Sequence, residues 1–353
     1  MKTLVRDKRD MVGGSLPAFM IAYAQKQAAI LPREKRYYAS WEWQQGVGLL
    51  GIWGLFKRTN DKKYLDALRS YFDACITDGL PGKNVNTMAP ILPLSFLAEY
   101  TNSDKYMQIC EEWAKWAMEE MPRTEEGGMQ HRTTDDENVG ELWDDTLMMT
   151  VLPVANIGRI LGKPEYIDEA TYQFLLHGEY LADPGTGLWY HGFSFVRKDH
   201  FAGAFWGRGN CWATITILLF LEIAKPRGAV RRYLCSLLRR QADALLPLQD
   251  GSGMWHTLLD KPDSYLEASA TAGFGYGFLK GMKMGVLDER FEKPASLALN
   301  AILSRIDGEG VLGDVSGGTP MGRDTQDFYR SIPIQPMPYG QALAALFFCQ
   351  VDA

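Results

Sequence analysis

The sequence predicts an all-α protein in which six helical hairpins close into an (α/α)6 toroid, a double ring of helices. Two kinds of helical segment alternate along its 353 residues, one apolar almost all round and one apolar along a single stripe. Similar turns recur at intervals of roughly 40 to 70 residues, which is typical of repeated supersecondary units. Strand-like alternation is almost absent. Inner helices that are apolar on every face favour a closed ring over an open solenoid, since both faces of a solenoid are wetted.

The first hairpin shows both kinds of helix. Its predicted inner helix, Trp43–Lys57, carries four glycines among apolar residues, and its predicted outer helix, Asp61–Ala74, is amphipathic. The turn between them, Thr59–Tyr64, returns as Thr101–Tyr106 and more loosely as Leu161–Tyr166. In each copy a polar residue that can cap a helix precedes a tyrosine in the first turn. The recurrence indicates a repeated structural unit.

Later hairpins are predicted from the same two patterns. They pair inner and outer helices at Asp144–Leu161 with Tyr166–Tyr180, Gly207–Ile223 with Ala229–Leu246, and Leu266–Met284 with Asp288–Ile306. A last inner helix, Tyr339–Val351, is expected to pair with an amino-terminal helix around Ser15–Ala29. The chain, residues 1–353, is therefore predicted to be a single domain. Its ligand cavity is expected where the inner helices begin.

Composition excludes several classes of function. The formal net charge is -6 and basic residues are scattered, so we expect neither a nucleic-acid nor a membrane partner. Charge alternates through the first ten residues, where a secretion signal would need an apolar core, and a cytoplasmic location is expected. Five cysteines without CxxC spacing indicate reduced thiols, and five histidines without a ligand-spaced pair predict no metal. No cofactor is expected.

The stretch Phe205–Trp212 opens one of the inner helices and carries unusual chemistry for a helix start. Arg208 offers a planar fork that suits a carboxylate, and Trp206 and Trp212 offer flat apolar faces on which sugar rings stack. Other connections before inner helices also carry aromatic, histidine or acidic residues. Because connections on a rigid scaffold commonly carry function, the sequence predicts a sugar-binding cleft.

Four motifs in this order resemble the unsaturated rhamnogalacturonyl hydrolases, glycoside hydrolase family 105. They are Trp143-x-Asp145-Thr146-Leu147-Met148-Met149, Trp189-Tyr190-His191, Trp206-Gly207-Arg208-Gly209-Asn210-x-Trp212 and Glu267-Ala268-Ser269. The resemblance covers essentially the whole chain and implies the (α/α)6 fold. It also implies an enzyme, commonly intracellular, that acts on the products of pectin lyases. Relatives in family 88 act on unsaturated glucuronyl ends instead, so the uronate stays open.

The resemblance implies that a double bond is hydrated, a reaction for which one carboxyl can suffice where ordinary glycosidases use two. Asp145 matches the aspartate of the Trp-x-Asp-Thr motif and is the predicted acid, which also activates the water. Burial beside Trp143 and Met149 is expected to raise its pKa. Asp144 is the alternative, but adjacent residues on a helix point about 100° apart, so only one is expected to face the cavity.

Further substrate contacts follow from the resemblance. His131 and His191 are expected to contact sugar hydroxyls or the water. Arg208 is expected to hold the carboxylate or a neighbouring hydroxyl, while Trp206 and Trp212 stack. An alternative for Arg208 is a buried pairing with an acid such as Glu267.

Two positions depart from the common family pattern. Trp43 stands where a tyrosine is frequent, and Asn86 stands where many members have an acid. Both are kept as predicted substrate-binding residues, which bear on the sugar that follows the unsaturated residue. The expected partner is a small unsaturated oligosaccharide.

Two other classes of function are left open by the residues. A sugar epimerase on the same toroid would use two histidines, such as His191 and His256, on opposite faces of the ring. A non-catalytic oligosaccharide-binding protein would bind without turnover.

Overall fold

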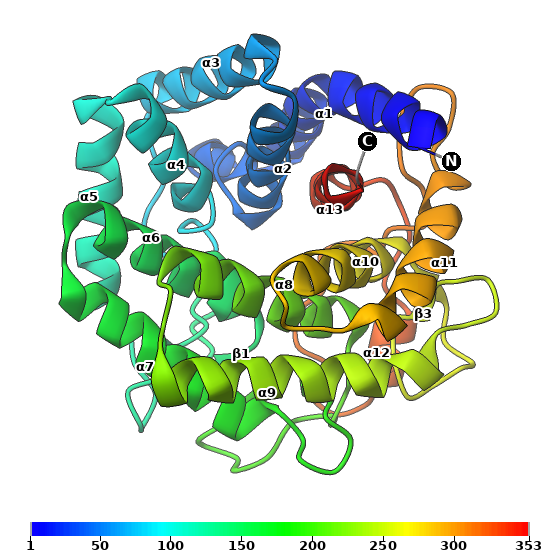
Figure 1. Ribbon diagram of the computed structural model, residues 1–353. Coiled ribbons are helices and arrows are strands. Elements are labelled where there is room, and N and C mark those ends of the chain that lie inside the picture. Colours follow the sequence, from blue (N-terminus) through cyan, green and yellow to red (C-terminus); the bar gives the residue numbers. More distant parts are fainter. Residues whose placement is uncertain (1, 352–353) are drawn as a thin grey trace.

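The computed structural model describes residues 2–351, which are mostly helical (Figure 1). Six helices lie inside: α2 (Trp43–Thr59), α4 (Ile91–Thr101), α6 (Leu152–Leu161), α8 (Gly207–Ile223), α10 (Ala268–Lys283) and α13 (Pro338–Gln350). Six lie outside: α1 (Lys2–Ile30), α3 (Lys62–Asp78), α5 (Asp104–Glu119), α7 (Pro164–Leu181), α9 (Gly228–Leu245) and α11 (Glu292–Leu303). The described residues therefore form two concentric layers.

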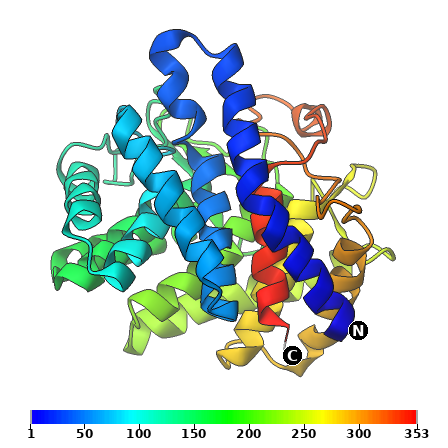
Figure 2. The ribbon, with the colours of Figure 1, turned by 90° about the horizontal axis from the view of Figure 1, so that it is seen from above.

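The inner helices form a closed ring. Each packs against the next in the order α2, α4, α6, α8, α10 and α13, and α13 returns to pack against α2. Every outer helix packs against an inner one, and α1 lies beside α13, as the sequence predicts (Figure 2). The predicted (α/α)6 toroid is confirmed.

Turns at the ends of the inner helices explain the recurring sequence. Asn60, Asn102 and Gly162 end α2, α4 and α6 in the left-handed conformation, with φ of 56°, 50° and 64°. Asparagine and glycine tolerate this conformation better than other residues. Asp61 and Ser103 then cap α3 and α5 by accepting backbone N–H groups of the first turn. The repeated turn thus has a conformational and a capping component.

Glycine allows α2 to approach its neighbours closely. A Cβ added to Gly51 would lie 2.6 Å from Cβ of Ala342 on α13, and one added to Gly46 would lie 2.6 Å from the carbonyl carbon of Ala89. Both contacts are far shorter than van der Waals distances. The glycines in this helix therefore let the ring close between its first and last inner helices.

The third inner helix differs from the prediction of one helix over Asp144–Leu161. Leu147–Val151 forms a π-helical turn, in which the Leu152 N–H donates to the carbonyl of Leu147, and α6 follows. Pro153 explains the change, because proline lacks an N–H and its ring clashes with the carbonyl four residues before it. The wider turn accommodates both effects.

The amino-terminal helix is also longer than predicted. It begins at Lys2 rather than around Ser15, because a sparse apolar stripe that includes Val5 and Val12 is buried against the ring. The side chain of Lys8 adds a hydrogen bond of 3.0 Å to the carbonyl of Ile306. At its other end α1 continues into the 3-10 helix η1 (Arg33–Ala39), and Figure 2 shows both projecting beyond the other helices.

Four short strands occur in the connections, where the sequence predicts almost none. β1 (Glu141–Trp143) pairs with β2 (Gly192–Ser194), and β3 (Trp255–His256) pairs with β4 (Leu266–Glu267). Segments of two or three residues are too short to show a strand period. The first pair joins the connections that precede the neighbouring inner helices α6 and α8, and the second lies within the connection that precedes α10.

The five cysteines are buried and unpaired, which agrees with the predicted reduced thiols. No helix within residues 2–351 combines the length and the apolar character needed to span a bilayer.

Gly51→Ala should destabilise the protein by roughly 1–3 kcal/mol, because the new methyl group meets Ala342 across the α2–α13 contact. Urea unfolding at equilibrium measures this change. Gly14→Ala is the matched control, since Gly14 is exposed and a Cβ added there would have no atom within 4 Å, and helix propensity predicts a gain of about 0.5–1 kcal/mol. Equal effects of the two substitutions would contradict the close-approach account.

Candidate active site

A pocket of about 330 Å³ opens at the end of the ring where the inner helices begin. This is the place that the sequence predicts for the ligand cavity, and the volume suits a small ligand. Its wall includes five of the predicted site residues, namely Trp43, Asn86, His131, Asp145 and Trp206. The rest of the wall comes mainly from α1, η1, residues 133–138 and residues 318–320.

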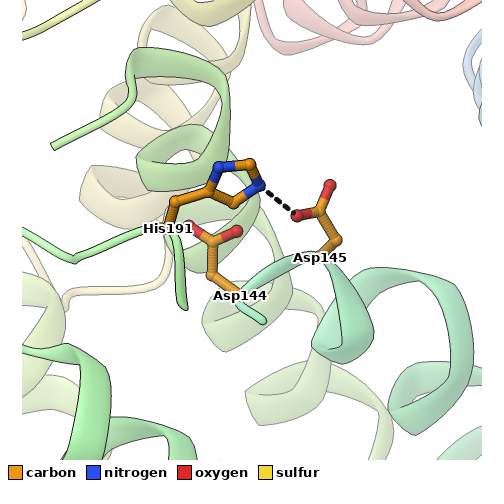
Figure 3. Close-up of side chains that lie close together, drawn as sticks. All are labelled: Asp144, Asp145 and His191. Carbon is orange, nitrogen blue, oxygen red and sulfur yellow. Dashed lines mark hydrogen bonds and ion pairs between the residues drawn. The ribbon is translucent and has the colours of Figure 1, made fainter. Parts of the chain in front are cut away.

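The β1–β2 pair positions the central carboxyl group. Trp143 pairs with Gly192 at the end of the ladder, and the Asp144 N–H then donates to the carbonyl of His191 at 3.0 Å. Asp145 follows at once, and its Oδ2 accepts a hydrogen bond of 3.1 Å from Nε2 of His191 (Figure 3). Its side chain is 13% exposed, so this carboxyl group remains accessible from the pocket.

Tyr329 fixes the orientation of the His191 ring from behind. Its hydroxyl lies 2.7 Å from Nδ1 of His191 and accepts the N–H of Gly322 at 3.1 Å. Burial raises the pKa of the Tyr329 phenol, so it stays protonated. A carboxylate can only accept, so Nε2 of His191 carries the hydrogen that is donated to Asp145, while Nδ1 faces the Tyr329 hydroxyl.

His131 and Trp143 form a flat wall beside the carboxyl group. Their rings stack with centroids 4.1 Å apart and planes 6° apart. Nδ1 of His131 lies 2.9 Å from the hydroxyl of Thr146, which follows Asp145. Burial lowers the pKa of His131 to about 3, so the ring is neutral at physiological pH. It is placed to form hydrogen bonds without bringing a positive charge.

Arg208 lies elsewhere than the sequence predicts. Its guanidinium is fully buried and donates to the carbonyls of Ser316 and Gly317 and to the hydroxyl of Thr319. It also lies 3.9 Å from Glu267, as the alternative interpretation expects. Arg208 is not among the pocket-lining residues, because its fork already holds this loop. In this structure Arg208 is therefore not positioned for the predicted contact with the sugar carboxylate.

The predicted stacking residues separate into two groups. Trp206 lines the pocket, with the Arg208 guanidinium 4.6 Å from its ring centroid, and Trp43 lines it while stacked on Tyr339 at 4.6 Å. Trp212 instead lies fully buried in the main hydrophobic core and does not line the pocket. The indole of Trp212 lies on the buried side of the helix that begins at Gly207, so it is not positioned to stack on a sugar.

Comparison with known proteins places this site in a family. Residues 18–352 match the family described as Glycosyl Hydrolase Family 88. The chain belongs to that family.

A relative from Bacillus subtilis, unsaturated rhamnogalacturonyl hydrolase YesR, is 34% identical, with 88% of this chain and 90% of the relative covered. A solved structure from Salmonella enterica, described as a possible member of the GH105 family, is 44% identical with a TM-score of 0.91 and covers 99% of this chain and 94% of its own. Another from Klebsiella pneumoniae, described likewise, is 45% identical with a TM-score of 0.92 and covers 98% and 93%. The resemblance to family 105 is confirmed.

The site of this family 88 protein differs from the sequence prediction in the charge state of Asp145. Burial raises the pKa of this carboxyl group, as predicted, but its contacts with His191, together with the effects of His131 and Asp144, outweigh burial and lower the pKa to about 2. The prediction of a raised pKa is therefore wrong for the unliganded site. It considers only the apolar neighbours, because the sequence does not show that His191 lies within hydrogen-bonding distance.

Asp144 carries the raised pKa instead. It is completely buried, neither oxygen has a hydrogen-bond partner among the described residues, and burial together with the charge of Asp145 raises its pKa well above the usual value. Gly209 of α8 packs against this carboxyl group so closely that a Cβ there would lie 2.2 Å from Oδ2. Asp145 lines the pocket and Asp144 does not, which agrees with the expectation that only one of them faces it.

These three side chains are also the group that could hold a metal ion. Asp144, Asp145 and His191 each offer a ligand atom, all within 4.8 Å of one another. Two of these atoms already hydrogen-bond each other, so a cation would have to replace the contact between His191 and Asp145. Hydration of a double bond of this kind needs only a protein acid.

Two features of the site escape the sequence analysis. Tyr329 contacts His191 from 138 residues away, and no motif around it indicates this contact. Glu42 lines the pocket, and burial raises its pKa to about 7. Its position directly before the predicted inner helix at Trp43 is the one signal that could have drawn attention to it.

Asp144→Asn should raise the melting temperature at pH 7 by at least about 2 °C. The pKa of Asp144 is raised by folding, so its unfavourable effect on stability grows as the pH rises above the unfolded value. The gain should therefore shrink as the pH is lowered toward 4, which thermal unfolding across this range measures. Asp135→Asn, at a side chain 72% exposed, is the control and should change little. A lower melting temperature for Asp144→Asn at pH 7 would contradict the assignment.

Proposed function

We propose that the protein removes the 4,5-unsaturated galacturonyl residue from the non-reducing end of rhamnogalacturonan oligosaccharides. The observation that carries this proposal is the accessible carboxyl group of Asp145, held by His191 in a pocket with flat aromatic walls. The similarity to unsaturated rhamnogalacturonyl hydrolase YesR over most of both chains supports the choice of substrate.

Addition of water across the double bond explains how one carboxyl group can act first as the acid and then as the base. The substrate is an enol ether, since C5 of its C4=C5 bond also carries the ring oxygen. The carboxylic acid form of Asp145 gives its proton to C4, and the electron pair of the double bond forms the new C–H bond. Positive charge then develops at C5 and is shared with the ring oxygen. The ionised Asp145 takes a proton from water as the water oxygen bonds to C5.

Bond breaking then follows from the product of hydration. The new hydroxyl group makes C5 a hemiketal, and the bond between C5 and the ring oxygen breaks to leave a ketone at C5. The ring oxygen remains on C1 as the hydroxyl of a hemiacetal. Breakdown of this hemiacetal releases the second sugar and leaves an aldehyde. One molecule of water is consumed, and Asp145 returns to its starting state.

The residues around Asp145 take distinct parts in this proposal. His191, oriented by Tyr329, holds one oxygen of the carboxyl group and leaves the other for the substrate. Trp206 and the stacked pair of His131 and Trp143 offer flat surfaces to the sugar ring. Trp43 and Asn86 line another part of the wall, where they are available to the sugar that follows.

Binding must change the protonation of Asp145. The carboxyl group is ionised in the unliganded site, and a uronate brings a second negative charge while it displaces water. Both effects raise the pKa of a buried carboxyl group. The substrate would thereby produce the acid form that its own hydration requires.

The other interpretations of the sequence receive less support. An epimerase needs two histidines across the pocket, whereas His256 bonds the carbonyl of Ser264 and does not line the pocket. Hydrolysis of an unsaturated glucuronyl substrate uses the same chemistry and forms the second arm of the test. A cytoplasmic role in pectin degradation is the proposed setting, since five buried thiols fit a reducing compartment.

Loss of the ultraviolet absorbance of the conjugated C4=C5 bond is the assay. The purified protein should consume the unsaturated rhamnogalacturonan disaccharide with release of rhamnose, and should consume an unsaturated chondroitin disaccharide more slowly. Faster loss with the chondroitin disaccharide would move the protein to the glucuronyl substrates. No loss with either would contradict the proposed function.

Asp145→Asn keeps the shape of the side chain but cannot supply the proton, so turnover in this assay should fall roughly a hundredfold or more. Asp144→Asn is the matched control, because that buried group is already neutral, and it should reduce turnover less than about tenfold. A larger loss of turnover in Asp144→Asn than in Asp145→Asn would contradict the assignment of Asp145 as the acid.

A further inference from the structure

Glu42 is another carboxyl group in the pocket, separate from Asp145 and its partner His191. It precedes α2, whereas Asp145 precedes the third inner helix, and α4 lies between them in the ring. The side chain is partly buried and lines the same pocket. The hydration chemistry has no use for it, because Asp145 supplies the only proton that the reaction needs.

Neighbouring residues hold this carboxyl group in place. Its Oε1 accepts a hydrogen bond of 2.7 Å from the hydroxyl of Thr134, which itself accepts one of 3.0 Å from the amide of Asn84. The other oxygen accepts the N–H of Trp43 at 3.3 Å. A carboxyl group can take part in about four hydrogen bonds, so each oxygen keeps capacity for a ligand.

Charge decides which part of the substrate this group can meet. A uronate carries its own carboxylate, and this part of the wall offers it two acidic groups, Glu42 and Asp135, as neighbours. Burial, with a smaller contribution from the charge of Asp135 on the neighbouring loop, raises the pKa of Glu42 to about 7. The counter-charge nearby, Lys35, is paired with Asp135. A neutral sugar with hydroxyl groups is the ligand that fits this part of the wall.

The substrate geometry brings such a sugar there. C4 of the unsaturated residue must reach Asp145, and C1, which bears the next sugar, lies on the opposite side of the six-membered ring. The next sugar therefore extends away from Asp145 toward the rest of the pocket wall. That wall contains Glu42 together with the projecting end of α1 and η1 (Figure 2).

We propose that Glu42 determines specificity by hydrogen bonding a hydroxyl group of the neutral sugar that follows the unsaturated uronate. This inference rests on the proposed function and adds the recognition of the second sugar. Glu42 takes no part in the proton transfer. It selects disaccharides whose second sugar presents a hydroxyl group at this position.

Calorimetric binding in an Asp145→Asn background, at pH 6, tests the assignment without turnover. The probes are the unsaturated rhamnogalacturonan disaccharide and the methyl glycoside of the unsaturated galacturonate, which lacks the second sugar. Adding Glu42→Ala should raise the Kd of the disaccharide about tenfold, the effect of one lost hydrogen bond, and change that of the methyl glycoside less than about twofold. Glu42→Gln keeps an acceptor and should stay within about threefold for both.

Asp61→Ala is the matched control, because it also removes an acidic cap, from α3, but at a helix start outside the pocket. It should leave both Kd values unchanged. Equal losses for the two probes in Glu42→Ala, or no loss for either, would overturn the inference. If the wild-type protein consumes no unsaturated substrate, the proposed function fails; if it does and the two probes respond alike, only the role of Glu42 fails.

Discussion

The buried hydrogen bond from His191 to Asp145 is the contact on which the site depends. It joins two connections that the β1–β2 pair has already brought side by side, and Tyr329 supports it from a third segment. A largely buried carboxylate needs such a partner, since an unpaired buried charge is strongly destabilising. The same contact sets the protonation state of Asp145 before substrate arrives. The hydrogen bond between His191 and Asp145 thus both holds the site together and sets the charge of its acid.

The closed ring supplies the rigid frame around this contact. Close approach at glycines joins the first and last inner helices, and Glu267 accepts the Ala270 N–H at the start of α10. Glu267 also accepts the N–H of Ser316, whose carbonyl receives Arg208. A buried network therefore fixes the loop that carries Gly318, Thr319 and Pro320 to the pocket. Arg208 shapes the site through this loop.

Regular features could be predicted from the sequence, and contacts between distant segments could not. The bounds of α8, Gly207–Ile223, agree with the prediction because all-round apolar character marks a buried helix. The π-helical turn at Leu147–Val151 arises from the geometry around one proline and leaves no periodic signal. The partners of Arg208 lie about 108 residues farther along the chain, and Glu42 is an isolated acid in the sequence. The motif identifies Asp145, whereas its lowered pKa depends on the position of His191.

Proton uptake on binding tests the central claim most directly. A saturated galacturonyl-rhamnose disaccharide cannot be hydrated, and calorimetric titration at pH 6 in two buffers of different ionisation enthalpy counts the protons that accompany its binding. Because Asp145 is ionised in the free protein and must be protonated in the complex, the wild type should take up close to one proton, and Asp145→Asn should take up none. Equal uptake by both proteins would contradict the view that the substrate converts Asp145 into the catalytic acid.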